Sequence, residues 1–568
     1  MPLLFNATAP TQVAPARASR PRSAAAALLP YSGPALLAVL SLGMLVRVYH
    51  FAYDRSFFID EIYLNVNFVG RSFWQLATEP LLYEQKAPLG YLWTVKLFAV
   101  LFGPGQQALR LFSLLSSLAA LLVLVPVARH FLRPWGVVAA VAMLAASDSC
   151  IYHALEAKQY AVELLATLLA LWLYIRYQPV PSLRGQLQWG LFGALLVWFS
   201  FPVIFVLAGM AGALGMAALL RRDWRQVRAY VLPFSCWLLS FGLQYALYIS
   251  KFPQSAWLMD FFDQQYDAFM PWSPTALLPW LAHKTYMLTQ HPLGLMPHKE
   301  DSEFLLFSPW RYVVKLGWLH LGFLLAGAAL LLRADRLKFF VLTLPIALML
   351  VASGLGVYPV FERFTQFLAP ALMLMAAYGL DRFLYAATPR FRAAPLVLLV
   401  FFAPPFYNTT AQALNPSRFK NREYNREVIM YVNAHYQPGD VVYLFWNMRH
   451  VYEYYQGAYG LRFTPVKGSN VKNESHNATE FMQKLQPDLA RLQGARRVWF
   501  VYDYVNRDPI GDYANQPAWY HEDAFKPTQP LEDYFAQHGR RIDFFQLGPH
   551  TASLYEMPRP AAASSPKP

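Results

Sequence analysis

The chain has 568 residues, of which 56% are hydrophobic, 16% aromatic and only 14% charged. Soluble domains carry about 25% charged residues, so this composition excludes an ordinary soluble protein and indicates a membrane protein. The net charge of +14 does not indicate a nucleic-acid partner, because the basic residues gather in short stretches between long apolar runs. The two cysteines, Cys150 and Cys236, both lie inside apolar runs, which excludes a disulfide framework and a cysteine-based zinc site.

Residues 1–30 are rich in Ala, Pro and Arg and are too polar for the core of a signal peptide. We therefore expect a disordered cytoplasmic tail followed by an uncleaved first transmembrane helix. Arginines precede this helix, and more arginines lie in the stretch 221–228 between two later runs. The positive-inside rule places both basic stretches in the cytoplasm.

About twelve apolar runs follow, each near the length needed to cross about 30 Å of hydrocarbon. They lie near 31–52, 88–104, 108–128, 135–153, 158–177, 187–203, 204–220, 228–250, 312–332, 337–356, 364–386 and 393–407. We predict a polytopic α-helical membrane domain over 31–408, with about 11–13 transmembrane helices. Two stretches, near 53–87 and 251–311, are predicted to be external loops, and aromatic residues in the second favour short helices on the membrane surface.

One basic stretch conflicts with simple alternation of these runs. The sequence "ARHFLRPW", residues 128–135, should be cytoplasmic, yet counting crossings from an external loop at 53–87 places it outside. Either one apolar run does not cross the membrane or the rule is broken locally. The first possibility also decides on which side residues 156–160 lie.

The composition changes at about residue 409 to that of a soluble domain. The segments "NREYNREVIMYVNAHY", "RHVYEYYQGAYG" and "TEFMQKLQPDLARLQG" predict helices, and "VVYLFW" and "RRVWFVYDYV" predict strands. The segments "RIDFFQLG" and "TASLYEM" are predicted to close the domain as a hairpin. This pattern predicts a soluble α/β domain over 409–560 with a partly parallel sheet, and a disordered tail at 561–568. No glycine pattern for binding phosphate is present, so this domain is expected to recognise an acceptor or to support the membrane part.

Two adjacent carboxylates, Asp60 and Glu61, open a helix-like segment just beyond the first apolar run. The sequence "YEQKAPLGYLW" then places a lysine and a proline at the start of the next run, and "YHALEAKQYAVELL" and "FERFTQFLAPALMLMAAYGL" place charged residues before two later runs. In this order the motifs resemble polytopic GT-C glycosyltransferases that use a polyprenyl-phosphate sugar, namely the protein O-mannosyltransferases and the bacterial aminoarabinose transferases. The resemblance covers about residues 35–405, with Lys158 and Gln159 in place of the family's Arg and Pro.

The resemblance implies an inverting glycosyltransferase that moves a sugar from a polyprenyl-phosphate donor to a hydroxyl or phosphate of a protein, lipid or glycan. It implies that the catalytic residues are Asp60 and Glu61, and that Lys86 and Arg363 bind the donor phosphate. The possible substrate-binding residues are Glu84, Glu156, Lys158 and Tyr160. It further implies a location in the bacterial inner membrane, with the reacting face and the C-terminal domain on the external, periplasmic side.

These residue types suit such a reaction. A carboxylate can take the proton of an acceptor hydroxyl, and cations can stabilise the phosphate that leaves. Asp60 is the expected base, and its apolar neighbours Phe57, Phe58 and Ile59 lead us to expect a raised pKa. On a regular helix Glu61 points about 100° away from Asp60, so both side chains cannot aim at one acceptor.

Each of these residues also has a structural interpretation. Asp60 could cap an interfacial helix, Lys86 could extend toward lipid head groups, and Arg363 could form an interfacial ion pair with Glu362. The charged pair Glu156 and Lys158 could mark membrane topology only.

No metal-binding spacing is convincing. The stretch "HPLGLMPHKED" offers His291, His298, Glu300 and Asp301, but an acidic loop gives the same letters. We therefore assign no cofactor, and a divalent metal stays possible.

A transporter with twelve transmembrane helices fits the composition equally well, and the intramembrane charges Arg47 and Asp148 could line its pathway. However, no inverted repeat with matching broken helices is evident, and an appended α/β domain is unusual in a transporter. A non-catalytic scaffold would leave the motifs around Asp60 and Lys86 without a purpose. The enzyme interpretation predicts a polyprenyl-phosphate sugar, membrane lipids and an acceptor as partners, and no nucleic acid.

Overall fold

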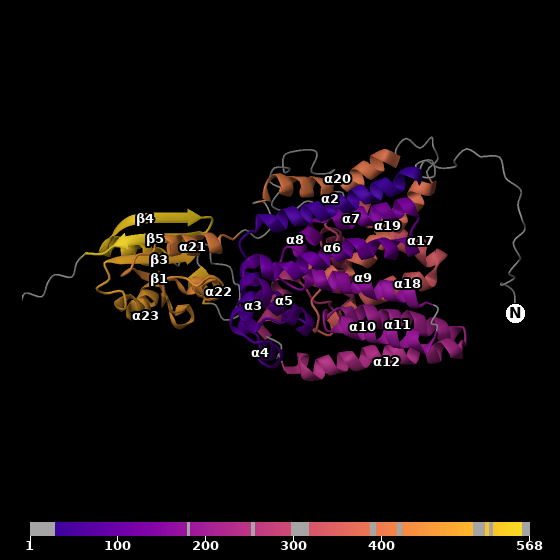
Figure 1. Cartoon of the computed structure of the whole chain (residues 1–568), viewed down its shortest axis with the longest axis horizontal. Coiled ribbons are helices and arrows are strands. Elements are labelled where there is room, and N and C mark those ends of the chain that lie inside the picture. Colours follow the sequence, from indigo (N-terminus) through magenta and orange to yellow (C-terminus); the bar gives the residue numbers. More distant parts are fainter. Residues whose placement is uncertain are drawn as a thin grey trace, which may run out of the picture.

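The structure is a computed structural model that describes residues 29–178, 182–251, 256–296, 317–386, 394–416, 423–503, 517–521, 526 and 528–558. The tail predicted at 561–568 and nearly all of the tail predicted at 1–30 lie outside the described residues. A bundle of long helices forms the larger part of the molecule, and a small α/β unit lies at one end of the bundle (Figure 1).

In the described residues, eight helices are long and apolar enough to cross a membrane. They are built on α2 (Ser32–Tyr53), α6 (Gln106–Phe131), α9 (Tyr160–Tyr177), α11 (Val203–Leu220), α12 (Trp224–Leu247), α17 (Gly317–Ala334), α18 (Arg336–Gly354) and α19 (Ala369–Ala386). A bent pair, α7 (Pro134–Ala146) and α8 (Asp148–Ala154), counts as a ninth crossing if it is one span. The bundle also contains α10 (Leu183–Val197) and α20 (Ala394–Leu414). The predicted polytopic helical fold is therefore confirmed.

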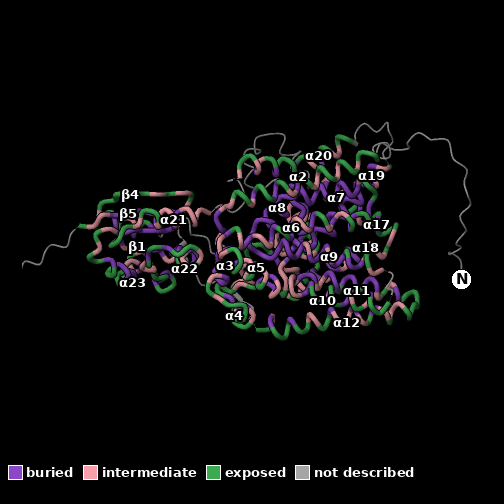
Figure 2. Tube along the Cα trace, in the orientation of Figure 1, coloured by how far each residue is buried: buried purple, intermediate pink, exposed green. Residues whose placement is uncertain are grey.

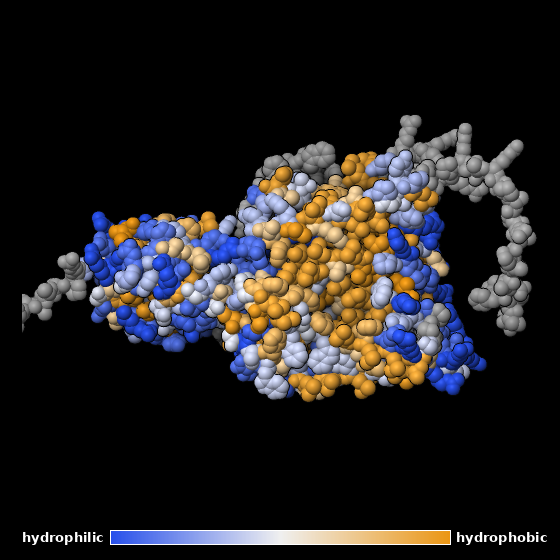
Figure 3. Space-filling model, viewed as in Figure 1, coloured by the Kyte–Doolittle hydropathy of each residue, from blue (hydrophilic) through white to orange (hydrophobic). Residues whose placement is uncertain are grey.

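The buried residues of the bundle concentrate in its centre, along α6, α7, α9 and α19 (Figure 2). Figure 3 shows a broad apolar surface over the bundle, whereas the α/β unit is mainly hydrophilic. This contrast is the one expected for helices that face lipid and a domain that faces water.

The apolar run at 88–104 forms α5 (Leu89–Phe102), which at 14 residues is too short to cross about 30 Å of hydrocarbon. Both of its ends lie beside the α/β unit. Just before α5, Tyr83 donates a hydrogen bond to Glu453, and just after it the Pro104 carbonyl accepts one from Tyr454. The chain therefore enters and leaves α5 at the same end of the bundle.

This return resolves the conflict at the basic stretch 128–135. Helix α6 starts beside the α/β unit, where Gln106 donates to the Tyr455 hydroxyl, and its 26 residues carry the chain about 39 Å away. At the far end the His130 carbonyl accepts a hydrogen bond from Lys338, at the start of α18. Of the two possibilities raised by the sequence, the structure supports the first: one apolar run does not cross, and residues 156–160 lie at the end that carries Asp60.

The pair α7 and α8 bends by 56° at Ser147. At this break the carbonyls of Leu144 and Ala145 lose their helical partners, and the Arg47 guanidinium from α2 donates to both at 2.8 and 3.1 Å. Arg47 also donates to the Ser117 hydroxyl at 2.8 Å. A fully buried arginine thus caps a broken transmembrane helix.

Two short helices, α3 (Ile59–Gly70) and α4 (Phe73–Thr78), lie at the end of the bundle next to the α/β unit (Figure 1). Ser72 caps α4 by accepting from the Gln75 amide. The side chain of Trp74 is 74% exposed, and tryptophan favours the membrane–water interface. We therefore place α4 at that interface.

The second predicted external stretch, 251–311, contains α13 (Ala256–Tyr266) and α14 (Pro274–Gln290). Short 3₁₀ helices connect other elements: η1 (Leu29–Tyr31), η2 (Leu82–Glu84), η3 (Ile249–Lys251), η4 (Glu362–Leu368), η6 (Trp446–Met448), η7 (Lys472–Glu474) and η9 (Ala518–His521).

The α/β unit contains the elements that its sequence predicts: α21 (Asn425–His435), β1 (Val441–Leu444), α22 (Arg449–Tyr459), α23 (Ala478–Ala490), β3 (Arg497–Asp503), β4 (Arg540–Leu547) and β5 (His550–Glu556). Two elements were not predicted, the edge strand β2 (Val466–Lys467) and α24 (Gln529–His538). The five-stranded sheet has the order β2-β1-β3-β5-β4; β1 is parallel to β2 and β3, and β5 is antiparallel to β3 and β4.

A single hydrophobic cluster crosses the junction between the bundle and the α/β unit. It joins Phe57 and Tyr91 from the first loop and α5 to Val451 and Tyr454 from α22. The rings of Phe57 and Tyr454 lie 5.2 Å apart between centroids. Asp54 adds an ion pair to Arg426 at the start of α21. Apolar and charged contacts therefore fix the α/β unit against the loop that carries Asp60.

Candidate active site

Asp60 lies in the first turn of α3 and forms an ion pair with Arg363 from η4, more than 300 residues away in the chain. The Asp60 side chain is 22% exposed, so its carboxylate can still be reached from outside the protein. The charge of Lys158, from the turn between α8 and α9, also acts on Asp60. The structure thus brings together three charged residues that the sequence selected from separate motifs.

Glu61, one position later, points in another direction and has no exposed surface. Arg110 from α6 donates two hydrogen bonds of 3.0 Å to its carboxylate, and the Ala157 amide donates one of 2.9 Å. The Phe58 amide donates a further bond of 3.1 Å, so the capping role considered for Asp60 belongs to Glu61. Asp60 and Glu61 therefore diverge, as expected for neighbours on a helix.

The pKa of Asp60 differs from the expectation. Burial raises the pKa of this carboxyl group, but the positive charges of Arg363 and Lys158 lower it by more. The net result is a pKa below the ordinary value, not above it. The apolar neighbours of Asp60 in the sequence predicted the wrong direction for its pKa, because the two cations that lower this pKa come from distant segments.

Lys158 is almost fully buried and donates a hydrogen bond of 2.6 Å to the Gln85 side chain. Burial lowers the pKa of Lys158, and the Asp60 carboxylate opposes this effect. Gln85 lies between Glu84 and Lys86, both of which are exposed. The segment that carries the lysine signature therefore contacts the Asp60 group through Gln85, a residue that the sequence motifs did not single out.

Glu156 and Tyr160 border the same group from the turn before α9 and from its first residue. Glu156 is buried and binds His153 at 2.7 Å between its carboxylate and Nδ1. The other ring nitrogen of His153 lies 3.2 Å from Nε2 of His291. Tyr160 is buried, and its ring packs on the ring of His153. The sequence missed His153 because a lone histidine in an apolar segment gives no signal of its partners.

In the part of the chain that the structure describes, no group of three or more His, Cys, Asp or Glu residues could hold a metal ion. Of the four residues considered for a metal, His291 contacts His153 and the Ser149 hydroxyl. His298, Glu300 and Asp301 lie outside the described residues.

A second polar group lies where the sheet meets α3, at the carboxyl ends of the parallel strands β1 and β3. The side chain of Asn447 donates to the backbone carbonyl of Asp503, the last residue of β3. Burial, together with the negative charge of Asp503, raises the pKa of Glu423 to about 8. Burial raises the pKa of Tyr63 on α3, and the negative charges of both Asp60 and Glu423 raise it further, so Tyr63 is within electrostatic reach of both groups. Sequence reasoning missed this group, since its members come from segments far apart in the chain that meet only in the folded structure.

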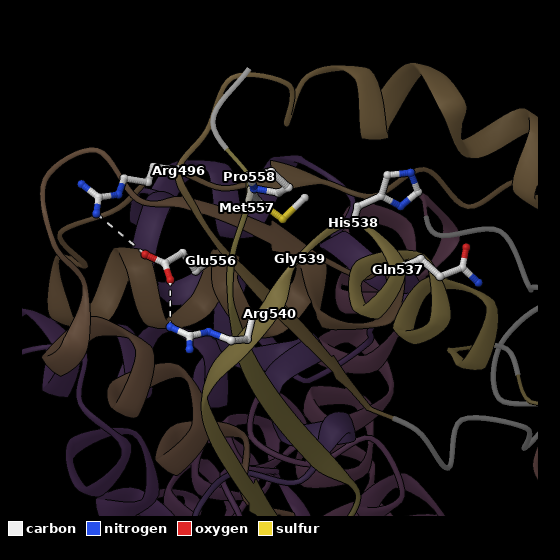
Figure 4. A pocket seen from close by; sticks show the side chains of 8 residues that line it. All are labelled: Arg496, Gln537, His538, Gly539, Arg540, Glu556, Met557 and Pro558. Carbon is white, nitrogen blue, oxygen red and sulfur yellow. Dashed lines mark hydrogen bonds and ion pairs between the residues drawn. The ribbon is translucent and has the colours of Figure 1, made fainter. Parts of the chain in front are cut away.

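A shallow cavity of about 480 Å³ lies at the opposite end of the sheet, where β3 and β4 begin. Figure 4 shows Glu556 between Arg496 and Arg540, with both arginines directed at its carboxylate. This cavity is far from Asp60 along the strands and contains none of the predicted site residues. The Asp60 group is therefore the stronger candidate for a reactive site.

Residues 86–242 match the family model of dolichyl-phosphate-mannose-protein mannosyltransferases. No curated protein sequence matches the chain.

Solved structures give a likeness over nearly the whole chain. The structure of ArnT from Cupriavidus metallidurans bound to undecaprenyl phosphate has 14% sequence identity and a TM-score of 0.50, and the match covers 96% of this chain and 100% of that one. The oligosaccharyltransferase AglB from Archaeoglobus fulgidus, in complex with an inhibitory peptide and a dolichol-phosphate, has 12% identity and a TM-score of 0.45, with 83% and 70% of the two chains covered. The family match and the fold of ArnT confirm the resemblance to GT-C glycosyltransferases, and the chain is an integral membrane protein of that fold.

The raised pKa of Glu423 predicts how stability depends on pH. Between its ordinary pKa of 4.5 and about 8, the folded protein keeps a proton on Glu423 that the unfolded chain has lost. Stability contributed by this group therefore falls as the pH rises through this window and levels off above it. Glu423→Gln removes this titrating group. The melting temperature of the variant minus that of the parent should therefore increase from pH 5 to pH 8. A difference that stays constant with pH would contradict the raised pKa.

Proposed function

We propose that this GT-C protein is an inverting glycosyltransferase that moves a sugar from a polyprenyl-phosphate donor to a hydroxyl or phosphate of a protein, lipid or glycan. The observation that carries the proposal is the Asp60 carboxylate, partly exposed and paired with Arg363 beside Lys158, at the membrane end where α4 lies in the interface. A polyprenyl chain stays in hydrocarbon while its phosphate stays at the head groups. Donor phosphate, cations and carboxylate therefore meet at this level.

In the proposed reaction, the acceptor oxygen attacks the anomeric carbon from the side opposite the phosphate. The acceptor gives its proton to Asp60, the bond between the anomeric carbon and the phosphate oxygen breaks, and polyprenyl phosphate leaves. One direct displacement inverts the anomeric centre, so a single carboxylate is sufficient. A carboxylate with a lowered pKa is ionised at neutral pH and ready to accept the proton.

Lys86 and Arg363 are the proposed donor-phosphate ligands. Arg363 is paired with Asp60 in the structure, and a phosphate that binds Arg363 competes for the same guanidinium. Donor binding would therefore loosen the ion pair and free Asp60 for the acceptor. Lys86 is exposed just before α5 and supplies a second positive charge that a phosphate can approach.

Asp60 is favoured over Glu61 as the base because the Glu61 carboxylate is fully buried and already accepts four hydrogen bonds, two from Arg110 and one each from the Phe58 and Ala157 amides. Glu61 holds α3 in place and thereby directs Asp60. Glu84, Glu156 and Tyr160 stay proposed substrate contacts. Glu156 and Tyr160 are buried on either side of Lys158 in the sequence, and Glu84 is exposed two residues before Lys86.

The transporter alternative depended on Arg47 and Asp148. Arg47 caps the broken helix at Ser147, and Asp148 accepts a hydrogen bond of 2.6 Å from Gln412 of α20. Both charges thus have structural partners around the bend between α7 and α8. These contacts favour the enzyme over a transport pathway.

Asp60→Asn provides the central test. The variant keeps the size of the side chain but removes the base, so transfer from a radiolabelled polyprenyl-phosphate sugar should fall by about a hundredfold or more. Thermal stability should stay near that of the parent, because the pair of Asp60 and Arg363 is partly exposed and Asn keeps an oxygen that can accept from the guanidinium. Glu61→Gln is the matched comparison: it should lower the melting temperature, since it leaves Arg110 buried with a weaker partner. Full activity in Asp60→Asn would refute the assignment of the base.

Donor binding can be measured separately from turnover. Lys86→Ala and Arg363→Ala should each weaken binding of undecaprenyl phosphate by about tenfold or more, since hydrogen bonds to charged groups contribute about 1.5–3 kcal/mol. Arg221→Ala, a distant exposed arginine after α11, is the control and should bind as the parent does. Parent-like binding by both site variants would place the phosphate elsewhere.

We further propose that the protein lies in a bacterial inner membrane, with Asp60 and the domain at 409–560 on the periplasmic side. The support is that the first loop and α22 share one core, while the basic stretch 128–135 lies at the other end. In sealed inverted vesicles, protease added outside should leave the C-terminal domain intact. Cleavage of the domain by this protease would show instead that Asp60 and the domain lie on the cytoplasmic side.

A further inference from the structure

The short segment between α4 and α5 has an unfavourable backbone. Tyr83 and Glu84 both lie in the left-handed region, with φ angles of 56° and 51°. Residues with a β-carbon adopt this conformation at a cost in free energy, and two in succession persist only when their surroundings hold them. The contacts that hold Tyr83 and its neighbour Gln85 therefore indicate what the segment is positioned to do.

On one side, Tyr83 is held by the C-terminal domain. Its ring stacks on Tyr63 at 4.7 Å between centroids, and its hydroxyl donates a hydrogen bond of 2.8 Å to Glu453 of α22. Glu453 is itself fixed by Arg449 and Lys467, at 3.2 and 3.0 Å. The carboxylate that receives Tyr83 is thus held by two cations of its own domain.

On the other side, the segment contacts the Asp60 group. The Gln85 side chain donates to the Tyr83 carbonyl at 3.1 Å and accepts from the Lys158 ammonium at 2.6 Å. The Leu82 amide donates to Asn67 of α3 at 2.8 Å, which anchors the start of the segment. A continuous chain of contacts therefore runs from Glu453 through Tyr83 and Gln85 to Lys158.

We propose that Tyr83, Gln85 and Glu453 are positioning residues through which the C-terminal domain holds Lys158 beside Asp60. This inference rests on the proposed function, because it assigns a catalytic consequence to the position of Lys158. The domain at 409–560 then acts on catalysis without contributing a reacting group. By holding Lys158, the domain determines how close a positive charge lies to the Asp60 carboxylate.

The consequence for Asp60 has a definite sign. The positive charge of Lys158 helps to lower the pKa of Asp60. If Lys158 is released, the pKa of Asp60 rises, and the acid limb of the activity profile moves to higher pH. A role confined to stability would change the amount of active protein but not this limb.

The test uses the full-length protein in lipid nanodiscs, with the variants Tyr83→Phe, Glu453→Gln, their combination, and Gln85→Ala. Tyr83→Phe removes only the hydroxyl and keeps the stacked ring. The control is Glu480→Gln, which removes a carboxylate from the same domain that pairs with Lys484 and His476 instead.

Tyr83→Phe, Glu453→Gln and Gln85→Ala should each lower kcat by about tenfold, with little change in the KM for the donor. The acid limb should shift to higher pH in each of them. The double variant Tyr83→Phe/Glu453→Gln should lose no more activity than the more impaired of its two single variants, because the two residues act as one contact. Gln85→Asn should restore part of the activity that Gln85→Ala loses. Additive losses, or an unshifted acid limb, would overturn the proposal.

A second measurement does not depend on transfer activity. Hydrogen exchange at the amides of Leu82 and Gln85 should be faster in Tyr83→Phe and Glu453→Gln than in the parent or in Glu480→Gln. Unchanged exchange would show that the domain does not hold the segment. If the parent transfers no sugar while exchange responds as expected, the proposed function fails and the link between domain and segment stands.

Discussion

The enclosed contact between Glu61 and Arg110 is the interaction on which the arrangement of the site depends. Arg110 donates two hydrogen bonds to the carboxylate, and the backbone of Ala157 donates a third. The contact joins α3, α6 and the turn before α9 at one point. Buried ion pairs add little net stability, but leaving one charge without its partner costs several kcal/mol, about 3–5. The geometry is therefore specified strongly, and Asp60, one residue earlier, is directed toward Arg363 as a result.

The C-terminal domain and the helix bundle share one hydrophobic core where they meet. Helix α22 of the domain packs Tyr454 against Phe57, three residues before Asp60, and the cluster continues into β1 and β3. The carboxyl ends of parallel strands are where α/β sheets ordinarily place their ligands. Here that edge faces α3, so the end of the sheet where α/β domains ordinarily bind ligands lies next to the bundle.

Local patterns predicted most of the fold. The twelve apolar runs correspond to helices of the bundle, α5 included, and the alternation after residue 409 corresponds to α21, β1, α22, α23, β3 and the hairpin. The order of motifs selected Asp60, Lys158 and Arg363, which the structure brings together. Short-range signals such as periodicity and charged residues at helix ends are sufficient for these conclusions.

What could not be predicted arises from contacts between distant segments. The direction of the Asp60 pKa depends on Arg363, 303 residues away, and not on neighbouring phenylalanines. The edge strand β2 has two residues and carries too little pattern to recognise. Gln85 and Glu423 have ordinary sequence contexts. Gln85 gains its partner Lys158 from the turn before α9, and Glu423 gains its charged neighbour Asp503 from the end of β3.

The short helix α4 fixes the depth of the Asp60 group along the membrane normal. Trp74 lies on its exposed side, and an indole at the head-group level resists movement in either direction along the membrane normal. Because α3 runs across the end of the bundle to α4 (Figure 1), Asp60 in its first turn is held at nearly the same level. A lipid-borne phosphate can then reach the cations by lateral diffusion alone, without being lifted from the bilayer. In the proposed reaction the acceptor has to reach this same layer, so the thickness and composition of the head-group region would contribute to the selectivity for acceptors.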